Sequence, residues 1–211
     1  MSVDLEFQKS LQINPLQPAE DVLERAVRLL DQGELIVVPT ETVYGLAGDL
    51  EIPGVLEKMY RAKGRPDDKP IPLFAAEVSW IEKAGAKLGP GERALAERFW
   101  PGPLTLVLRV GDGFKGFRIP DYPVSLALLK KVGRILGVTS ANRSGEPSAE
   151  TAEAARAALG ERVGVILDAG PSPGGIPSTV VKASGGTLEI LRAGAIAPED
   201  IMRIYMEAQR I

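Results

Sequence analysis

The stretch Arg61-Ala-Lys63-Gly-Arg65-Pro-Asp-Asp-Lys69-Pro70 places four cations within nine residues. Its glycine and prolines cannot continue a helix, so the sequence predicts a stiff loop between a helix and a strand. Lys63 and Arg65, two residues apart on an extended segment, would point the same way and could bind one polyanion such as a triphosphate. A solvated basic loop is the alternative interpretation, and other segments must decide between the two.

Composition excludes several classes of function. The 211 residues are 45% hydrophobic and 25% charged with a net charge of -3, which is typical of a globular protein with one sizeable core. The chain has no cysteine and no histidine, which excludes disulfides, thiolate nucleophiles, cysteine–zinc sites and the commonest general base. The remaining carboxylates, hydroxyls, cations and backbone N–H groups suit the positioning of anions. The net charge argues against a general nucleic-acid coat and still allows a local basic cleft.

The sequence contains no apolar run near the roughly 20 residues that span a bilayer. Its first residues also lack a basic region followed by an apolar one. We therefore expect a cytoplasmic protein without membrane contact.

Hydrophobic periodicity and turn residues predict alternating helices and strands. Helices are expected over 18–33, 53–60, 78–84, 91–100, 123–132, 148–160 and from 198 onward, and strands over 34–38, 71–76, 104–110, 135–138, 163–167, 178–181 and 187–192. Ser148 is the expected N-cap of its helix, and Met202 is expected on the core face of the last one. A glycine-rich loop is expected around residues 111–116. The pattern predicts one layered α/β (α+β) domain with a mixed, twisted sheet and flanking helices.

Three polar segments follow predicted strands. Hydroxyls at 40, 42 and 44 could share one face of an extended segment, or they could be edge-strand threonines and a half-buried tyrosine. Residues 139–148 precede a helix N-terminus and could bind phosphate, or form an ordinary capped connection. Residues 168–177 are rich in glycine and proline and suggest a rigid functional loop. Arg118, flanked by apolar residues, looks locally like a surface guanidinium with a buried stem.

Seven motifs occur in a specific order along the chain. They are Pro39-Thr-Glu-Thr-Val-Tyr-Gly-Leu46, Lys63-Gly-Arg65-Pro66, Trp100-Pro-Gly-Pro103, Arg118-Ile-Pro120, Ser140-Ala-Asn142, Pro177-Ser-Thr-Val180 and Leu191-Arg192-Ala-Gly194. In this order they resemble the YrdC-like threonylcarbamoyl-adenylate synthases over residues 20 to 195, and an ordered set is far more specific than one tripeptide. The resemblance implies a YrdC-like fold with a concave, basic cleft.

The resemblance also implies a reaction, in which L-threonine, bicarbonate and ATP give threonylcarbamoyl-adenylate and pyrophosphate. A separate transferase would use the product to modify an anticodon-loop adenosine of tRNA, with tRNA itself contacted only indirectly. We accordingly expect a lead-in over 1–17, a catalytic domain over 18–195 and a C-terminal helix over 196–211 that packs on the same domain.

The family's site residues carry over to matching positions. The implied ATP-binding set is Lys63, Arg65, Lys69, Ser140, Asn142, Ser148 and Arg192, of which Lys63 and Arg65 are also the implied catalytic pair. The implied threonine-binding set is Thr42, Tyr44, Arg118, Val138 and Ser178. Arg118 would hold the amino-acid carboxylate, for which a guanidinium can supply two parallel N–H···O bonds. No side chain is assigned to a metal, and Mg²⁺ would arrive with ATP.

Some positions depart from the family pattern. Phe74 and Tyr122 stand where many longer relatives have histidine, although an apolar residue at 74 resembles the short bacterial branch. The C-terminal domain of longer relatives has no counterpart, so the loop at 170–177 is a candidate lid.

Two other functions stay open. One is an RNA-binding module that uses the basic cleft, although only 5% of the residues are aromatic and no stacking run accompanies the cations. The other is a carbamoyl-adenylate-forming relative, which the stand-alone length and the lack of zinc-finger cysteines disfavour.

Overall fold

The computed structural model describes residues 9–64 and 70–210. Arg65 and Lys69, both expected at the triphosphate, lie outside the described residues. In the described part, no helix is both long and apolar enough to cross a membrane.

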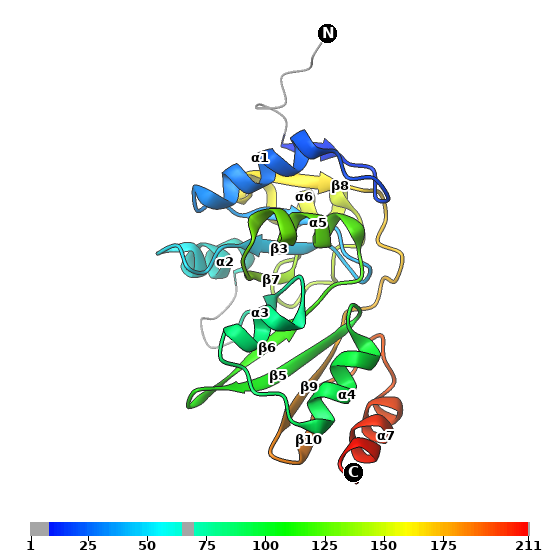
Figure 1. Cartoon of the computed structure of the whole chain (residues 1–211). Coiled ribbons are helices and arrows are strands. Elements are labelled where there is room, and N and C mark those ends of the chain that lie inside the picture. The colour runs from blue at the N-terminus through cyan, green and yellow to red at the C-terminus, as the bar shows by residue number, and fades with distance from the viewer. Residues whose placement is uncertain (1–8, 65–69, 211) are drawn as a thin grey trace.

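The described residues form seven α-helices and ten strands, as the sequence pattern predicts in outline (Figure 1). The helices are α1 (Glu20–Asp31), α2 (Val55–Lys63), α3 (Val78–Lys83), α4 (Pro90–Phe99), α5 (Pro123–Val132), α6 (Ala152–Leu159) and α7 (Pro198–Ala208). The strands are β1 (Ser10–Gln12), β2 (Ile36–Val38), β3 (Gly45–Gly48), β4 (Leu73–Phe74), β5 (Leu104–Val110), β6 (Gly113–Arg118), β7 (Leu136–Ser140), β8 (Val165–Asp168), β9 (Thr179–Ser184) and β10 (Thr187–Arg192).

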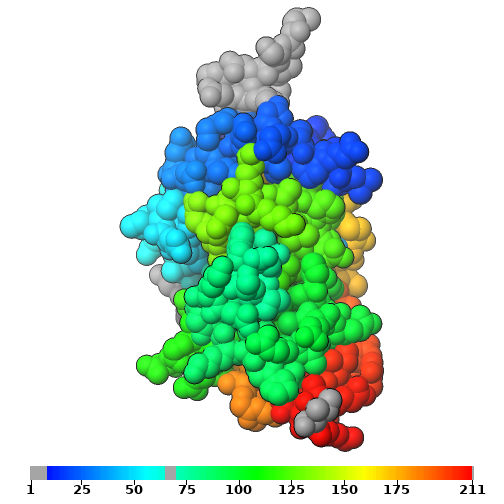
Figure 2. Space-filling model, viewed as in Figure 1, coloured from blue at the N-terminus to red at the C-terminus, as the bar shows by residue number. Residues whose placement is uncertain are grey.

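All ten strands join one mixed sheet in the order β1-β8-β2-β3-β7-β4-β6-β5-β9-β10. The sheet contains parallel pairs, such as β2 with β8 and β5 with β9, and antiparallel pairs, such as β3 with β7. The mixed sheet predicted from the sequence is confirmed. The chain runs from one end of the body to the other, so α1 and α7 lie at opposite ends (Figures 1 and 2).

Helices cover the sheet on both faces of its first half. One core cluster joins α1 and α5 to the sheet, and a second joins α2 and α6 to the opposite face. A third cluster packs α3, α4 and α7 against β5, β6 and β9. The ends of α5 illustrate the local chemistry. The helix begins with Pro123, whose missing N–H has no intrahelical partner at that position, and Gly133 in the left-handed region caps its last turn.

Several boundaries differ from the sequence prediction. Lys63 is the last residue of α2, and the loop begins only at Gly64, which caps the helix at φ 56°. The expectation that Lys63 lies on an extended loop is therefore wrong. Residues 113–118 form β6, because Gly111 at φ 57° closes a two-residue turn that pairs Val110 with Gly113.

Three smaller expectations are also corrected. Thr151 caps α6, since its hydroxyl accepts the N–H of Ala154, so Ser148 is not the N-cap. Met202 is 46% exposed, although its neighbour Ile201 is buried as expected. Residues 10–12 of the expected lead-in form β1, which pairs in parallel with β8 in the same sheet.

Gly194 lies where two segments come into close contact. A Cβ at this position would meet Pro177 O at 2.4 Å and Thr179 N at 2.5 Å, both backbone atoms that cannot move aside alone. The glycine thereby lets the end of β10 lie against the start of β9.

We expect Gly194→Ala to lower the free energy of unfolding by about 1–3 kcal/mol, the usual cost of overpacking a tight contact. Gly113→Ala is the matched control, because the nearest atom to its Cβ, Val110 O, is 4.0 Å away. Urea denaturation measures both. Equal unfolding midpoints would contradict the proposed steric constraint.

Candidate active site

A cavity of about 130 Å³ lies where strands from both halves of the sheet end. It is lined by Thr40, Thr42, Val43, Tyr44, Gly45, Pro72, Phe74, Thr105, Arg118, Val138, Thr139, Ser140, Pro177, Ser178 and Arg192. Sheet pairing brings these positions together, since Gly45 pairs with Ser140 and Phe74 pairs with Arg118. All five residues of the expected threonine set line this cavity; their binding role stays a prediction.

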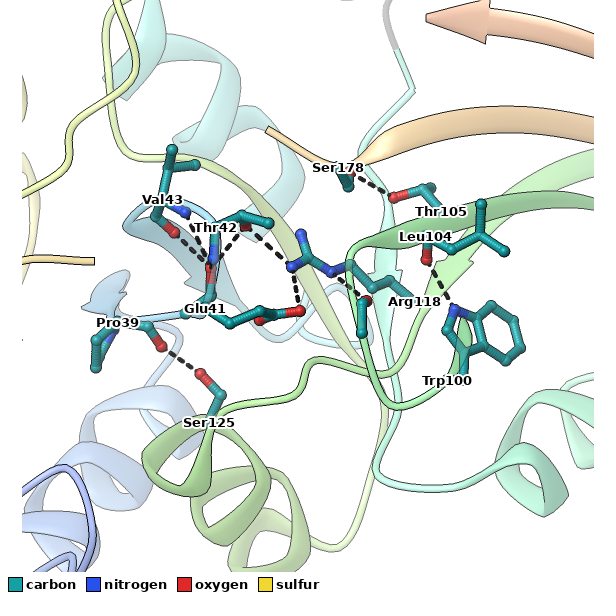
Figure 3. A network of polar contacts seen from close by, with 12 residues as sticks. Pro39, Glu41, Thr42, Val43, Trp100, Leu104, Thr105, Arg118, Ser125 and Ser178 are labelled. Carbon is teal, nitrogen blue, oxygen red and sulfur yellow. Dashed lines mark hydrogen bonds and ion pairs between the residues drawn. The ribbon is translucent and has the colours of Figure 1, made fainter. Parts of the chain in front are cut away.

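Arg118 is the most constrained side chain of the site (Figure 3). It is buried; Nε donates to Gly102 O at 3.2 Å, and Nη2 donates to Glu41 Oε1 at 2.7 Å and Thr42 Oγ1 at 3.0 Å. The guanidinium also lies over the Phe74 ring, 5.3 Å from its centroid. The local interpretation of Arg118 as a surface residue is therefore wrong.

The polar segment before β3 is bent, so its hydroxyls do not share one face. Thr40 and Thr42 contact each other, with 2.9 Å between their hydroxyl oxygens, and Thr40 Oγ1 donates to Val43 O at 2.6 Å. Tyr44 turns elsewhere: its hydroxyl donates to Gly170 O at 2.6 Å and accepts the N–H of Ala169 at 3.2 Å. The segment thus divides into a threonine pair at the cavity and a tyrosine that anchors another loop.

Burial raises the pKa of Tyr44 to about 12, because the charged phenolate loses its hydration there. The phenol therefore stays neutral at physiological pH and keeps its donor for the 168–177 loop. A second bond, from Gly174 N to Glu41 O at 3.0 Å, ties the same loop to the segment before β3. The candidate lid is thus held against the site in this structure.

Arg192 reaches the same cavity from the end of β10. Its Nη2 donates to Ser178 O at 2.6 Å and to Ser178 Oγ at 3.1 Å. Thr105 Oγ1 lies 2.9 Å from Ser178 Oγ, which fixes that hydroxyl from the other side. Arg192, assigned to ATP by resemblance, therefore contacts Ser178, a member of the expected threonine set.

Lys63 is buried beneath the 139–148 loop. Its ammonium donates to the carbonyl of Ser140, to Asn142 O at 2.7 Å and to Asn142 Oδ1 at 3.4 Å. The Asn142 amide in turn donates to Glu146 O at 2.6 Å. In this structure Lys63 therefore shapes the loop from below, and its predicted contact with the triphosphate stays untested.

The rest of the ATP set divides between two hollows. Ser140 and Arg192 line the cavity, whereas Asn142 and Ser148 line a second hollow of about 520 Å³ whose walls include small alanines of α6. Pockets that hold drug-sized ligands measure roughly 300–1,000 Å³. The second hollow has room for a nucleoside, and the first has room only for a smaller molecule.

The cavity lining favours an anion. The described lining residues include two guanidinium groups and several hydroxyls, and they include no carboxylate. Such guanidinium groups are expected to attract and orient a carboxylate or phosphate. Within residues 9–64 and 70–210, no group of three metal-ligating side chains occurs.

Sequence reasoning missed Glu41 and the carbonyl of Gly102, which both hold Arg118. Both lie inside recognised motifs, yet no local signal links either to residue 118. Tyr122, one of the two departures from the family pattern, is buried in the same core cluster as Phe74 and does not line the cavity. Burial raises its pKa above the ordinary value of a tyrosine.

A family model named Sua5/YciO/YrdC, with the description telomere recombination, matches residues 28–194. The chain belongs to this family. The threonylcarbamoyl-AMP synthase of Bacillus subtilis is 37% identical over 85% of this chain and 55% of that protein. A putative threonylcarbamoyl-AMP synthase of Mycobacterium tuberculosis is 38% identical over 85% of this chain and 87% of that protein. The chain thus spans about half of one curated relative and most of the other.

Solved structures of the Sua5/YciO/YrdC family show the same fold. A crystal structure of P. abyssi Sua5 complexed with L-threonine matches with a TM-score of 0.88 and 28% identity, over 93% of this chain and 61% of that one. E. coli YciO matches with a TM-score of 0.81 over 90% of this chain and 98% of that one. At 24% identity, YciO supports the fold alone.

Replacing Lys63 tests its position beneath the loop. Lys63→Met removes the donor for Ser140 O and Asn142 O, and leaving such buried acceptors unpaired costs about 1–3 kcal/mol of unfolding free energy. We expect ATP affinity to fall together with stability, because the loop that carries Ser140 and Asn142 loses its support.

Lys58→Met on the same helix is the control. Its ammonium donates to Gly33 O at 2.9 Å and pairs with Glu34, but the two paired side chains are 38% and 44% exposed, and such surface pairs contribute about 0–1 kcal/mol. Denaturation and calorimetry with ATP measure the two effects. A stable Lys63→Met variant that loses only ATP binding would show instead that the ammonium contacts the nucleotide directly.

Proposed function

We propose that this protein is an L-threonylcarbamoyladenylate synthase, a nucleotidyltransferase that uses L-threonine, bicarbonate and ATP. The observation that carries the proposal is the convergence of Arg118, Arg192 and a set of hydroxyls on a small cavity beside a larger hollow. The names of relatives with 37–38% identity, and the threonine complex of P. abyssi Sua5, support it.

The two hollows suit two substrates of different size. Threonine would occupy the small cavity, with its carboxylate at Arg118, and the nucleoside of ATP would occupy the hollow beside Asn142 and Ser148. Ser140 and Asn142 are two residues apart on one loop. Ser140 lines the small cavity, and Asn142 lines the larger hollow. The reacting groups would therefore meet near this loop.

The chemistry needs alignment more than a titrating base. The threonine amine and bicarbonate form a carbamate with loss of water, a carbamate oxygen attacks the α-phosphorus, and pyrophosphate leaves. Catalysis of this kind depends on holding the reactants in line and on neutralising phosphate charge. Arginines, hydroxyls and loop N–H groups can do both without histidine or cysteine.

Further parts of the proposal concern partners. Mg²⁺ would be carried by the ATP phosphates, where it neutralises charge and keeps mostly phosphate and water ligands. A separate tRNA threonylcarbamoyl transferase would consume the product, and we propose a cytoplasmic location for both proteins.

The reaction is tested by pyrophosphate release with L-threonine, bicarbonate and ATP omitted one at a time. We expect release only with all three present. Release that does not need threonine would overturn the proposed reaction, and release that depends on an added carbamoyl donor in place of threonine and bicarbonate would favour carbamoyl-adenylate formation. Steeply salt-dependent RNA binding without any ATP turnover would favour a binding module.

Arg118→Ala should weaken threonine binding by about 2–5 kcal/mol if the bound carboxylate is left buried without a partner. Arg118→Lys should not restore it, because an ammonium cannot donate in the plane to Gly102, Glu41 and Thr42 at once. The control is ATP affinity, measured by calorimetry without threonine, which should change far less. Equal losses for both ligands would remove Arg118 from the amino-acid site.

A further inference from the structure

The donors of Arg118 can be counted one by one. A guanidinium carries five N–H groups, one on Nε and two on each terminal nitrogen. Nε donates to Gly102 O, and the two N–H groups of Nη2 go to Glu41 and Thr42. Within the part of the chain that the structure describes, no acceptor is paired with Nη1, which Figure 3 shows without a dashed contact. Only Nη1 is therefore left for a ligand.

The threonine hydroxyls beside Arg118 are less completely fixed. Thr40 Oγ1 donates to Val43 O at 2.6 Å and accepts the N–H groups of Thr42 and Val43, at 3.1 and 3.2 Å. These contacts use its proton and both of its lone pairs, so the 2.9 Å contact between the two hydroxyls does not fix which of them donates. Thr42 Oγ1 accepts from Arg118 Nη2. Thr42 thus offers the cavity a hydroxyl next to the Arg118 guanidinium.

Glu41 forms an ion pair with the Arg118 guanidinium. Its Oε1 lies 2.7 Å from Arg118 Nη2, and the two side chains are only 15% and 5% exposed. The other carboxylate oxygen, Oε2, is buried and has no partner among the described residues. Buried ion pairs often add little net stability, and an unpaired oxygen makes such a pair less favourable still. Stability alone therefore does not account for a glutamate at this position.

We propose that Glu41 is a positioning residue of the amino-acid site. By accepting one N–H of Nη2, it orients the Arg118 guanidinium so that Nη1 faces the cavity as a donor beside the Thr42 hydroxyl. This deepens the proposed function and rests on it. The substrate carboxylate then binds at Nη1, and a polar group of the same substrate, its amine or its β-hydroxyl, binds at Thr42.

The arrangement differs from the two parallel bonds expected from the sequence. Both N–H groups of Nη2 and the one on Nε are already used, so neither edge of the guanidinium is free for a bidentate carboxylate. The carboxylate is instead held at Nη1 alone, with the Thr42 hydroxyl beside it. Such a site selects ligands that carry an acidic group next to a second polar group.

Two variants at one position separate geometry from charge. In Glu41→Ala the guanidinium loses its support, and we expect L-threonine affinity to fall about 10- to 100-fold, the loss typical of a charge-assisted bond that is no longer aligned. In Glu41→Gln the amide oxygen can accept the same N–H, so threonine affinity should stay close to wild type. Calorimetry measures threonine, and separately ATP, whose affinity should stay unchanged in both variants.

The matched control is Glu82→Ala. Arg93 Nη2 lies 2.7 Å from Glu82 Oε1, the same separation as in the Glu41 pair, but both side chains are largely exposed and neither lines the cavity. Loss of this ion pair should leave threonine affinity at the wild-type value.

The orientation of the guanidinium can also be followed without substrate. The Arg118 Nε–H, assigned by its loss in Arg118→Lys, should exchange slowly with water in wild type and Glu41→Gln and much faster in Glu41→Ala. This measurement tests Glu41 even if wild type binds no threonine, a result that would overturn the proposed function instead.

Several outcomes would overturn the role of Glu41. Equal threonine loss in Glu41→Gln and Glu41→Ala would show that charge and not orientation matters. Tighter threonine binding in either variant would make Glu41 a competitor for Arg118. Parallel losses of threonine affinity, ATP affinity and thermal stability would reduce Glu41 to a structural residue.

Discussion

A buried guanidinium links segments that are far apart in the sequence. Arg118, at the end of β6, is hydrogen-bonded to Thr42 before β3 and to Gly102 before β5, and it stacks on Phe74 of β4. Burying a cation is costly unless most of its donors find acceptors, so each of these segments must stay in register for the site to form. The cavity is thus a consequence of how the two halves of the sheet are joined.

Much of the fold follows from local pattern, because apolar periodicity and turn residues act within a few positions. The strand over Leu104–Val110 and the helix beginning at Pro123 agree with prediction. Prediction fails where contacts with residues far along the chain determine the position of a side chain. Lys63 is the last residue of α2 and its ammonium is bonded to carbonyls of the distant 139–148 loop. Met202 is exposed although its helical position matches the core face.

The candidate site shows the same division. The ordered motifs identify residues that the structure does bring to one cavity, including Thr42, Arg118 and Ser178. They do not reveal what each polar atom does. Glu41 pairs with a residue 77 positions later, and the Tyr44 hydroxyl donates to a loop carbonyl 126 positions later. Hydrogen-bond direction depends on such distant partners, so residue type alone could not predict it.

The low acidity of Tyr44 has a consequence for how the site responds to its surroundings. Guanidinium groups stay charged, and aliphatic hydroxyls stay neutral, throughout the pH range in which proteins are folded. The tyrosine of the lining has a pKa of about 12, and the described lining contains neither a carboxylate nor an imidazole. The residues that line the cavity therefore keep the same charges over this range, and the titratable group nearest to them is the Glu41 carboxylate that pairs with Arg118 from behind the wall.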